Sequence, residues 1–156
     1  MDRRDFVIGA AASVVGTALA GAAGAASHGD GHDHGQHGHH TTDPKLGKVV
    51  ESTLACERAA GDCVRHCIEM LAEGHGDMAE CLDSVLRMRA VTGAMHAVAV
   101  SEHAPSKRTR ELAAVCAAFC RDCAEACKPH ADKHAECQAC LEACEECAEA
   151  CEALAG

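Results

Sequence analysis

Cysteines at helical spacing are the feature of this 156-residue chain that most constrains its fold. A run of four, from Cys116 to Cys127, steps by four, three and four residues, and a run of five, from Cys137 to Cys151, steps by three, four, three and four. An α-helix turns about 100° per residue, so such steps return to the same face. Each run therefore predicts a helix with a narrow stripe of thiols along one face.

Two earlier segments carry weaker versions of the same pattern. Cys56, Cys63 and Cys67 share one helical face, because steps of seven and four residues both nearly close a turn. The next segment has a single cysteine, Cys81, whose same-face neighbours are Val85, Met88, Thr92, Met95 and Ala99. We interpret the two methionines in that set as core packing rather than as ligands.

Capping residues and helix breakers predict the first two helices. The first begins at Pro44 after the capping residue Asp43 and ends at Gly74. The second begins near Asp77, with Glu80 three residues later in capping-box spacing, and runs to about position 103.

Prolines bound the second half of the chain. Pro105 and Ser106 open the third predicted helix and Pro129 ends it, and the fourth runs from about His130 to Leu154. No segment shows the alternation typical of strands. Four helices with short connections predict an all-α domain at residues 44–156, an antiparallel up-down-up-down four-helix bundle with a cysteine-lined core.

The first 26 residues have the pattern of an export signal. Arg3 and Arg4 precede a mildly apolar run and a small-residue cleavage site, Ala23-Gly24-Ala25, as in a twin-arginine signal. The segment is too weakly hydrophobic to favour a membrane anchor. We therefore expect an exported, periplasmic protein with no stable membrane association once the signal is removed.

Residues 27–43 form a His-rich linker without apolar periodicity, which we expect to be disordered. Imidazole at this density can capture divalent copper, nickel or zinc, although a solvated tether is the alternative interpretation. The candidate ligands are His28, His32, His34, His37, His39 and His40.

The formal net charge of −10 argues against nucleic acid and anionic membranes as partners, and it favours cations. The acidic residues fall on the outward faces of the predicted helices, serine is sparse and no glycine-rich phosphate loop is present. These features indicate a protein that is not an enzyme.

Several functions can require thirteen cysteines in one domain. A disulfide-knit interaction module would suit an exported protein, but β-carbons at i and i+4 on a helix lie about 5–6 Å apart, whereas a disulfide needs about 3.8 Å. Zinc favours closed sets of four ligands, and ferredoxin-like iron–sulfur clusters use a different spacing that ends in proline. These three alternatives remain open.

Monovalent copper fits the pattern best, because it is soft and accepts thiolate ligands. A buried thiolate is costly unless its charge is balanced, and one Cu(I) per thiolate gives a neutral core. The empty core, made of thiols, is neutral as well, which predicts a bundle that folds before it is loaded. The candidate ligands are Cys56, Cys63, Cys67, Cys81, Cys116, Cys120, Cys123, Cys127, Cys137, Cys140, Cys144, Cys147 and Cys151.

From about Pro44 to Gly156, these cysteine stripes resemble those of the bacterial copper storage proteins, and the leader resembles that of their exported branch. The resemblance implies a four-helix bundle that holds multiple Cu(I) ions for supply to copper enzymes or for detoxification, and that catalyses no reaction. It also implies a homotetramer, and storage implies a copper enzyme or chaperone that receives the metal.

One end of the predicted bundle is richer in cysteine, and it also carries methionine and histidine side chains that could pass copper inward. The opposite end has aliphatic residues that resemble a plug: Leu46, Val49, Val50, Val98 and Leu112. We call the candidate uptake residues at the cysteine-rich end the mouth residues: Met70, Met78, His75, His130 and His134. Gap-filling methionines and surface histidines are the alternative interpretation of this set.

Overall fold

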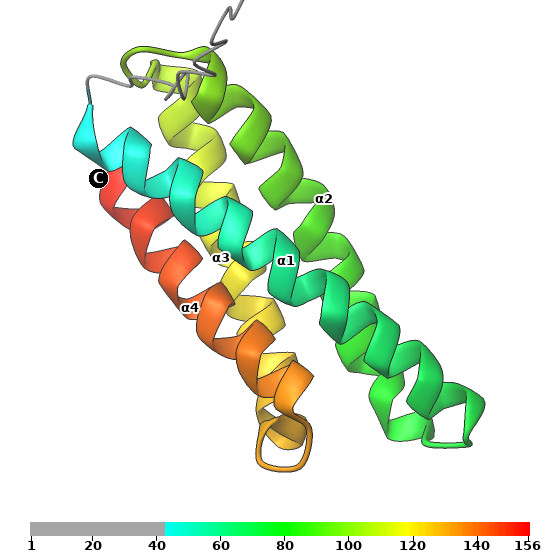
Figure 1. The fold of residues 1–156 in the computed structure, drawn as a ribbon. Helices are drawn as coiled ribbons and strands as arrows, with labels where there is room; N and C mark the ends of the chain where they lie inside the picture. Colours follow the sequence, from blue (N-terminus) through cyan, green and yellow to red (C-terminus); the bar gives the residue numbers. More distant parts are fainter. Residues whose placement is uncertain (1–42) are drawn as a thin grey trace, which may run out of the picture. The chain divides into compact units, whose positions relative to one another are not determined.

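The computed structural model describes residues 43–156, so the predicted export signal and all but the last residue of the predicted linker lie outside the described part. Four long helices account for most of this part: α1 (Pro44–Ala72), α2 (Ala79–Ser101), α3 (Lys107–Ala131) and α4 (Ala135–Ala155). A short 3-10 turn, η1 (Gly76–Met78), joins α1 to α2. Figure 1 shows the helices running alternately up and down. The predicted all-α antiparallel bundle is confirmed.

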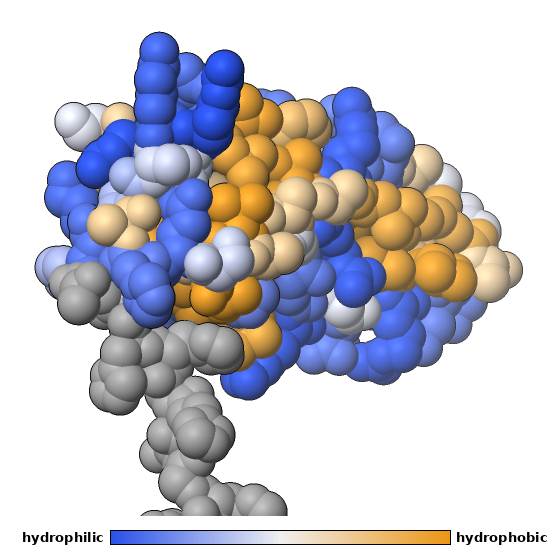
Figure 2. Space-filling view, turned by 90° about the horizontal axis from the view of Figure 1, so that it is seen from above, coloured by the Kyte–Doolittle hydropathy of each residue, from blue (hydrophilic) through white to orange (hydrophobic). Residues whose placement is uncertain are grey.

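Each helix packs against two neighbours, so the four helices enclose one core. Helix α1 contacts α2 and α4, and α3 contacts the same two helices from the opposite corner. No helix in residues 43–156 is both long and apolar enough to cross a bilayer. Figure 2 shows hydrophobic surface between hydrophilic side chains. The exposed large apolar residues of the described part are Leu54, Ile68, Leu86 and Val115.

Different side chains fill the core at the two ends of the bundle. We call the end that holds η1 and the α3–α4 turn the sulfur end, because Cys67, Cys81, Cys127 and Cys137 lie in the adjoining helical turns. The other end, which we call the hydrocarbon end, buries Leu46, Val49, Ala99, Ala113 and Leu154 completely. The predicted aliphatic plug is confirmed in Leu46 and Val49, while Val50, Val98 and Leu112 are only partly buried.

Side-chain caps start the helices at the hydrocarbon end. The Asp43 carboxylate accepts hydrogen bonds from the backbone N–H of Lys45 at 2.8 Å and of Leu46 at 3.3 Å, and Pro44 occupies the first turn. Ser106 Oγ accepts from the Thr109 N–H at 3.1 Å. Both caps satisfy backbone donors that have no partner within the helix. The sequence predicted the cap of α1, whereas for α3 it predicted only the start of the helix at Pro105 and Ser106.

The predicted capping box at the start of the second helix is wrong. Asp77 lies within η1, and the residue that precedes α2 is Met78, which forms no side-chain cap. Gly74 explains the geometry: with φ of +97° it adopts the left-handed conformation that favours glycine, which ends α1 and leads the chain into the 3-10 turn. Asp77 is therefore not at the position from which its carboxylate could cap α2.

The predicted boundary between the last two helices is also wrong. Pro129 lies inside α3, which continues to Ala131, so His130 belongs to α3 and does not open the fourth helix. A proline in the last turn removes one intrahelical donor but does not prevent a final half-turn. The backbone N–H groups of Lys133 and His134 both donate to the His130 carbonyl at 3.0 Å, and α4 begins at Ala135.

Candidate metal centre

All thirteen cysteines point into the bundle core. Each has no exposed surface, and each is a free thiol. Helix α1 supplies three of them, α2 one, α3 four and α4 five. The sequence prediction that the stripes face inward is confirmed, because helical steps of three, four and seven kept every cysteine on the face that packs against neighbouring helices.

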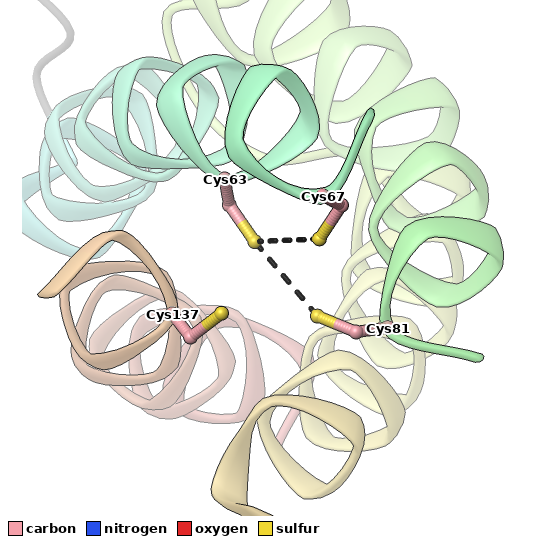
Figure 3. A group of neighbouring side chains, drawn as sticks. All are labelled: Cys63, Cys67, Cys81 and Cys137. Atoms are coloured by element: carbon pink, nitrogen blue, oxygen red, sulfur yellow. Dashed lines mark hydrogen bonds between the residues drawn. The ribbon is translucent and has the colours of Figure 1, made fainter. Parts of the chain in front are cut away.

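Four sulfurs from three helices gather at the sulfur end (Figure 3). Cys63 and Cys67 extend from α1, Cys81 from α2 and Cys137 from α4, and their four Sγ atoms all lie within 4.8 Å of one another. The Cys63 Sγ is 3.9 Å from the Cys67 Sγ and 3.8 Å from the Cys81 Sγ. This tetrad brings together enough thiols for a four-coordinate site, which the sequence spacing alone did not predict.

The other sulfurs continue the tetrad along the core as overlapping groups of three. Cys81 Sγ lies 3.6 Å from Cys127 Sγ, and Cys56 Sγ lies 3.7 Å from Cys144 Sγ. Cys63 and Cys140 each belong to two groups and so join three of the groups, while Cys147 joins the other two. The contact between Cys56 and Cys144 connects these two sets, so the groups form a continuous ladder rather than separate sites. The groups of three are Cys56, Cys120 and Cys147; Cys63, Cys127 and Cys140; Cys116, Cys147 and Cys151; and Cys123, Cys140 and Cys144.

These separations suit metal ions that bridge pairs or trios of sulfurs. For a metal–sulfur bond of roughly 2.3 Å, the length of a zinc–thiolate bond, two trigonal ligands lie about 4 Å apart and two linear ligands about 4.6 Å apart. The observed Sγ–Sγ distances of 3.6 to 3.9 Å need only small side-chain movements to accept an ion. The ladder can therefore hold many ions in a row without moving the helices.

Hydrogen bonds between thiols, together with burial, raise the pKa of most cysteines in this core, whereas the pKa values of Cys81, Cys127, Cys140 and Cys147 are lowered. Burial, followed by the effect of nearby Cys81, raises the pKa of the Cys67 thiol to about 12. Hydrogen bonds to Cys127, Cys137, Cys140 and Cys81 raise the pKa of Cys63. In contrast, hydrogen bonds from Cys123, and also from Cys63 and Cys81, lower the pKa of Cys127 to about 6. Ions that enter the ladder must therefore displace protons from most thiols.

The predicted mouth residues all lie at the sulfur end, but their exposure differs widely. Met78 and His130 are buried, with 1% and 9% of their surfaces exposed. Met70 and His134 are partly buried, and His75 is exposed. The His130 and His134 ring centroids lie 6.5 Å apart. The alternative of surface histidines therefore describes His75, but it does not describe His130.

Sequence reasoning missed one residue at this end, His66. Its ring centroid lies 4.7 Å from that of His134, and its Nδ1 lies 3.7 Å from a carboxylate oxygen of Glu136. The other ring nitrogen, Nε2, is buried and has no hydrogen-bond partner among the described residues. The available signal was its position, three residues after Cys63 and directly before Cys67.

Comparison with known proteins gives one family. The family model described as "Copper storage protein" matches residues 42–156. A comparison with curated proteins gave no match.

The solved structures that resemble this chain include copper storage proteins as well. The copper storage protein Ccsp from Streptomyces lividans, loaded with 10 copper equivalents, is 29% identical, with a TM-score of 0.64 over 71% of this chain and 83% of that chain. A structure of a cytosolic copper storage protein from the same organism, with five coppers, has the same identity and TM-score and is covered over 92% of its length. The apo form of copper storage protein 3 from Bacillus subtilis is 26% identical, with a TM-score of 0.60 over 70% of this chain and 98% of that chain.

Proposed function

Because this chain belongs to the copper storage protein family, we propose that it sequesters multiple Cu(I) ions on the thiolates that line its core. The observation that carries the proposal is the ladder itself, in which thirteen buried free thiols lie in overlapping groups along one bundle. A catalytic metal site needs an open coordination position and access for a substrate. A fully buried series of similar sites instead suits storage.

Charge explains why the ions should be monovalent. Each Cu(I) that replaces a thiol proton leaves the core neutral, whereas each divalent ion would add a net charge that a dry interior cannot solvate. Thiolates are soft ligands and favour monovalent copper for the same reason that they favour other soft ions. The same helices can then pack around empty and loaded cores.

We expect copper to enter at the sulfur end through the mouth residues. Met78 and His130 are buried at this end, and the His134 ring lies 4.7 Å from the His66 ring. Thioether and imidazole groups are weaker ligands for Cu(I) than thiolates, so they can bind an ion briefly and transfer it to the thiolates of the core. At the hydrocarbon end, fully buried Leu46, Val49 and Leu154 would oppose the passage of an ion.

Replacing Met70, Met78, His130 and His134 together tests this route. Stopped-flow mixing with Cu(I) should show slower uptake, while the number of ions bound at equilibrium stays the same, because every thiol is retained. A variant that takes up copper at the normal rate would contradict the proposed mouth.

The export of the protein, its assembly as a homotetramer and metal capture by the His-rich linker are further parts of the proposal. They rest on the leader sequence, on the family resemblance and on the linker composition. Cell fractionation tests export: the double substitution Arg3→Lys and Arg4→Lys should retain the protein in the cytoplasm, whereas unchanged export would rule out the twin-arginine route.

The metal class is tested by the spectrum of the loaded protein. After anaerobic addition of Cu(I), the full chain should remain colourless and gain ultraviolet thiolate-to-copper bands. A brown protein after purification would instead indicate an iron–sulfur centre. Thiol titration of the apo-protein should find nearly all thirteen cysteines reactive after denaturation, and a low count would indicate the disulfide-knit alternative.

A further inference from the structure

One layer of the sulfur ladder is incomplete when only cysteines are considered. Cys56 of α1, Cys120 of α3 and Cys147 of α4 place their Sγ atoms within 4.8 Å of one another. Three of the four helices therefore contribute one thiol each to this layer. Helix α2, whose only cysteine lies at the sulfur end, contributes none.

The residue of α2 that faces this layer is Met88. Its side chain is completely buried, and its thioether Sδ lies 3.5 Å from the Cys56 Sγ, which donates a hydrogen bond to it. This separation is as short as the contacts between the thiols themselves, of which the shortest is 3.6 Å. Met88 thus places a thioether sulfur from α2 in direct contact with the Cys56 thiol of this layer.

Neighbouring polar groups leave the lone pairs of the Met88 sulfur available. The Thr92 hydroxyl lies 3.6 Å from Met88 Sδ but only 2.5 Å from a carboxylate oxygen of Glu57. A hydroxyl has one proton, and a charged carboxylate is a stronger acceptor than a thioether. Arg89 Nε donates to the other Glu57 oxygen at 3.3 Å, which fixes the carboxylate in place. The thioether therefore remains free to accept the thiol proton of Cys56.

We propose that Met88 is a ligand of the stored copper, which completes a layer of three thiolates and one thioether. This inference rests on the proposed storage of Cu(I). An ion replaces the Cys56 thiol proton between Sγ and Sδ: one Cu(I) enters and one proton leaves. With metal–sulfur bonds of roughly 2.3 Å, the two sulfurs need to separate by only about half an ångström from their present distance. A neutral thioether adds a ligand without altering the charge balance of the core.

Met95 provides a matched control on the same helix. It lies two helical turns after Met88 on the same face, and it too is completely buried. No thiol donates a hydrogen bond to the Met95 sulfur within residues 43–156, and it lies toward the hydrocarbon end. Both methionines can be replaced by leucine with little change in side-chain volume.

Selenium labelling tests the proposal directly, because it places an X-ray absorber at each methionine. The full chain is prepared with selenomethionine and the substitutions Met70→Leu and Met78→Leu, so that neither mouth methionine contributes to the signal. It is then loaded anaerobically with Cu(I) alone. Selenium-edge absorption should show a Se–Cu interaction in this protein and after a further Met95→Leu change. The interaction should be lost after a further Met88→Leu change, with Met1 present in every variant as a constant background.

The outcomes separate this inference from the storage function. Ultraviolet thiolate-to-copper bands without a Se–Cu interaction would overturn the role of Met88 and leave storage intact. Persistence of the interaction after Met88→Leu would overturn that role as well. A protein that binds no Cu(I) would overturn both the role of Met88 and the storage function. If the Met88→Leu variant folds poorly, the Met95→Leu protein decides the question, because Met88 and Met1 are then its only selenium sites. A Se–Cu signal in that protein supports the role of Met88, and its absence overturns that role.

Discussion

The hydrocarbon end and the sulfur end of this bundle differ both in what fills them and in how their helices begin. At the hydrocarbon end, aliphatic side chains fill the core, and side chains of Asp43 and Ser106 cap α1 and α3. At the sulfur end, thiols fill the core, and the residues that precede α2 and α4, Met78 and His134, form no side-chain caps. The contrast indicates that one end supplies stability and the other end handles the metal.

The physical basis of this division is the energy of what is buried. Removing a large aliphatic side chain from water contributes about 1.5–3 kcal/mol, while a cysteine contributes less because it is small. Free backbone donors at an uncapped helix start also reduce local stability. A region that must admit ions benefits from being the less stable end, because it can open without unfolding the bundle.

The largest expected effect comes from the hydrocarbon end. Leu46→Ala should lower the free energy of unfolding of the apo-protein by about 2–5 kcal/mol, because it leaves a cavity at a completely buried position of the core. Urea denaturation followed by circular dichroism measures the change. Cys81→Ala is the matched variant at the sulfur end, and an equal loss of stability there would break the comparison.

Removing the tetrad should lower the copper capacity more than the stability. With Cys63, Cys67, Cys81 and Cys137 all replaced by alanine, the protein should lose four of its thirteen thiols and a similar share, about a third, of its copper capacity, because roughly one ion is held per thiolate. Its unfolding transition should shift less than that of Leu46→Ala. Metal analysis after gel filtration gives the capacity, and full capacity in the variant would show that the tetrad stores no copper.

The pH dependence of copper binding should differ between cysteines with a raised pKa and cysteines with a lowered pKa. Burial raises the pKa of Cys67 to about 12, so at neutral pH this thiol is protonated and each ion bound there releases one proton. Its apparent affinity should therefore rise about tenfold, or 1.4 kcal/mol, per pH unit. At Cys127, whose pKa is lowered to about 6, this dependence should disappear above that pH.

Proton release in weakly buffered solution measures this effect. The average should be below one proton per copper at neutral pH, because the thiols with a lowered pKa, such as Cys127 and Cys140, are already ionised. Release of no protons would mean that the empty core is filled with thiolates, which contradicts the neutral core on which the storage proposal depends.

The smallest expected effect concerns the caps. Asp43→Ala removes the acceptor for two backbone donors and should cost about 1 kcal/mol of stability. His134→Ala at the start of α4 should cost only a few tenths, because its side chain forms no cap. Chemical denaturation of both variants compares the two ends directly, and equal losses would show that the caps do not distinguish them.

The sequence predicted the bundle and the inward thiols well because both follow from a local period. A stripe such as Cys137 to Cys151 defines its own buried face before any neighbour is known. The failures arose where structure depends on the path of a turn or on a neighbouring helix. Glycine geometry at Gly74 displaced the expected Asp77 cap, and Pro129 did not stop α3. The closeness of His66 to His134, and of Met88 to Cys56, joins residues far apart in the chain.

Storage in a neutral, prefolded core is tested most directly by an anaerobic titration of the apo-protein with Cu(I) in the presence of a competing chelator. We predict that the full chain withdraws many equivalents, of the order of one for each of its thirteen thiols, while its helical content stays constant. Saturation at one or two equivalents, or a protein that folds only as copper is added, would contradict this prediction.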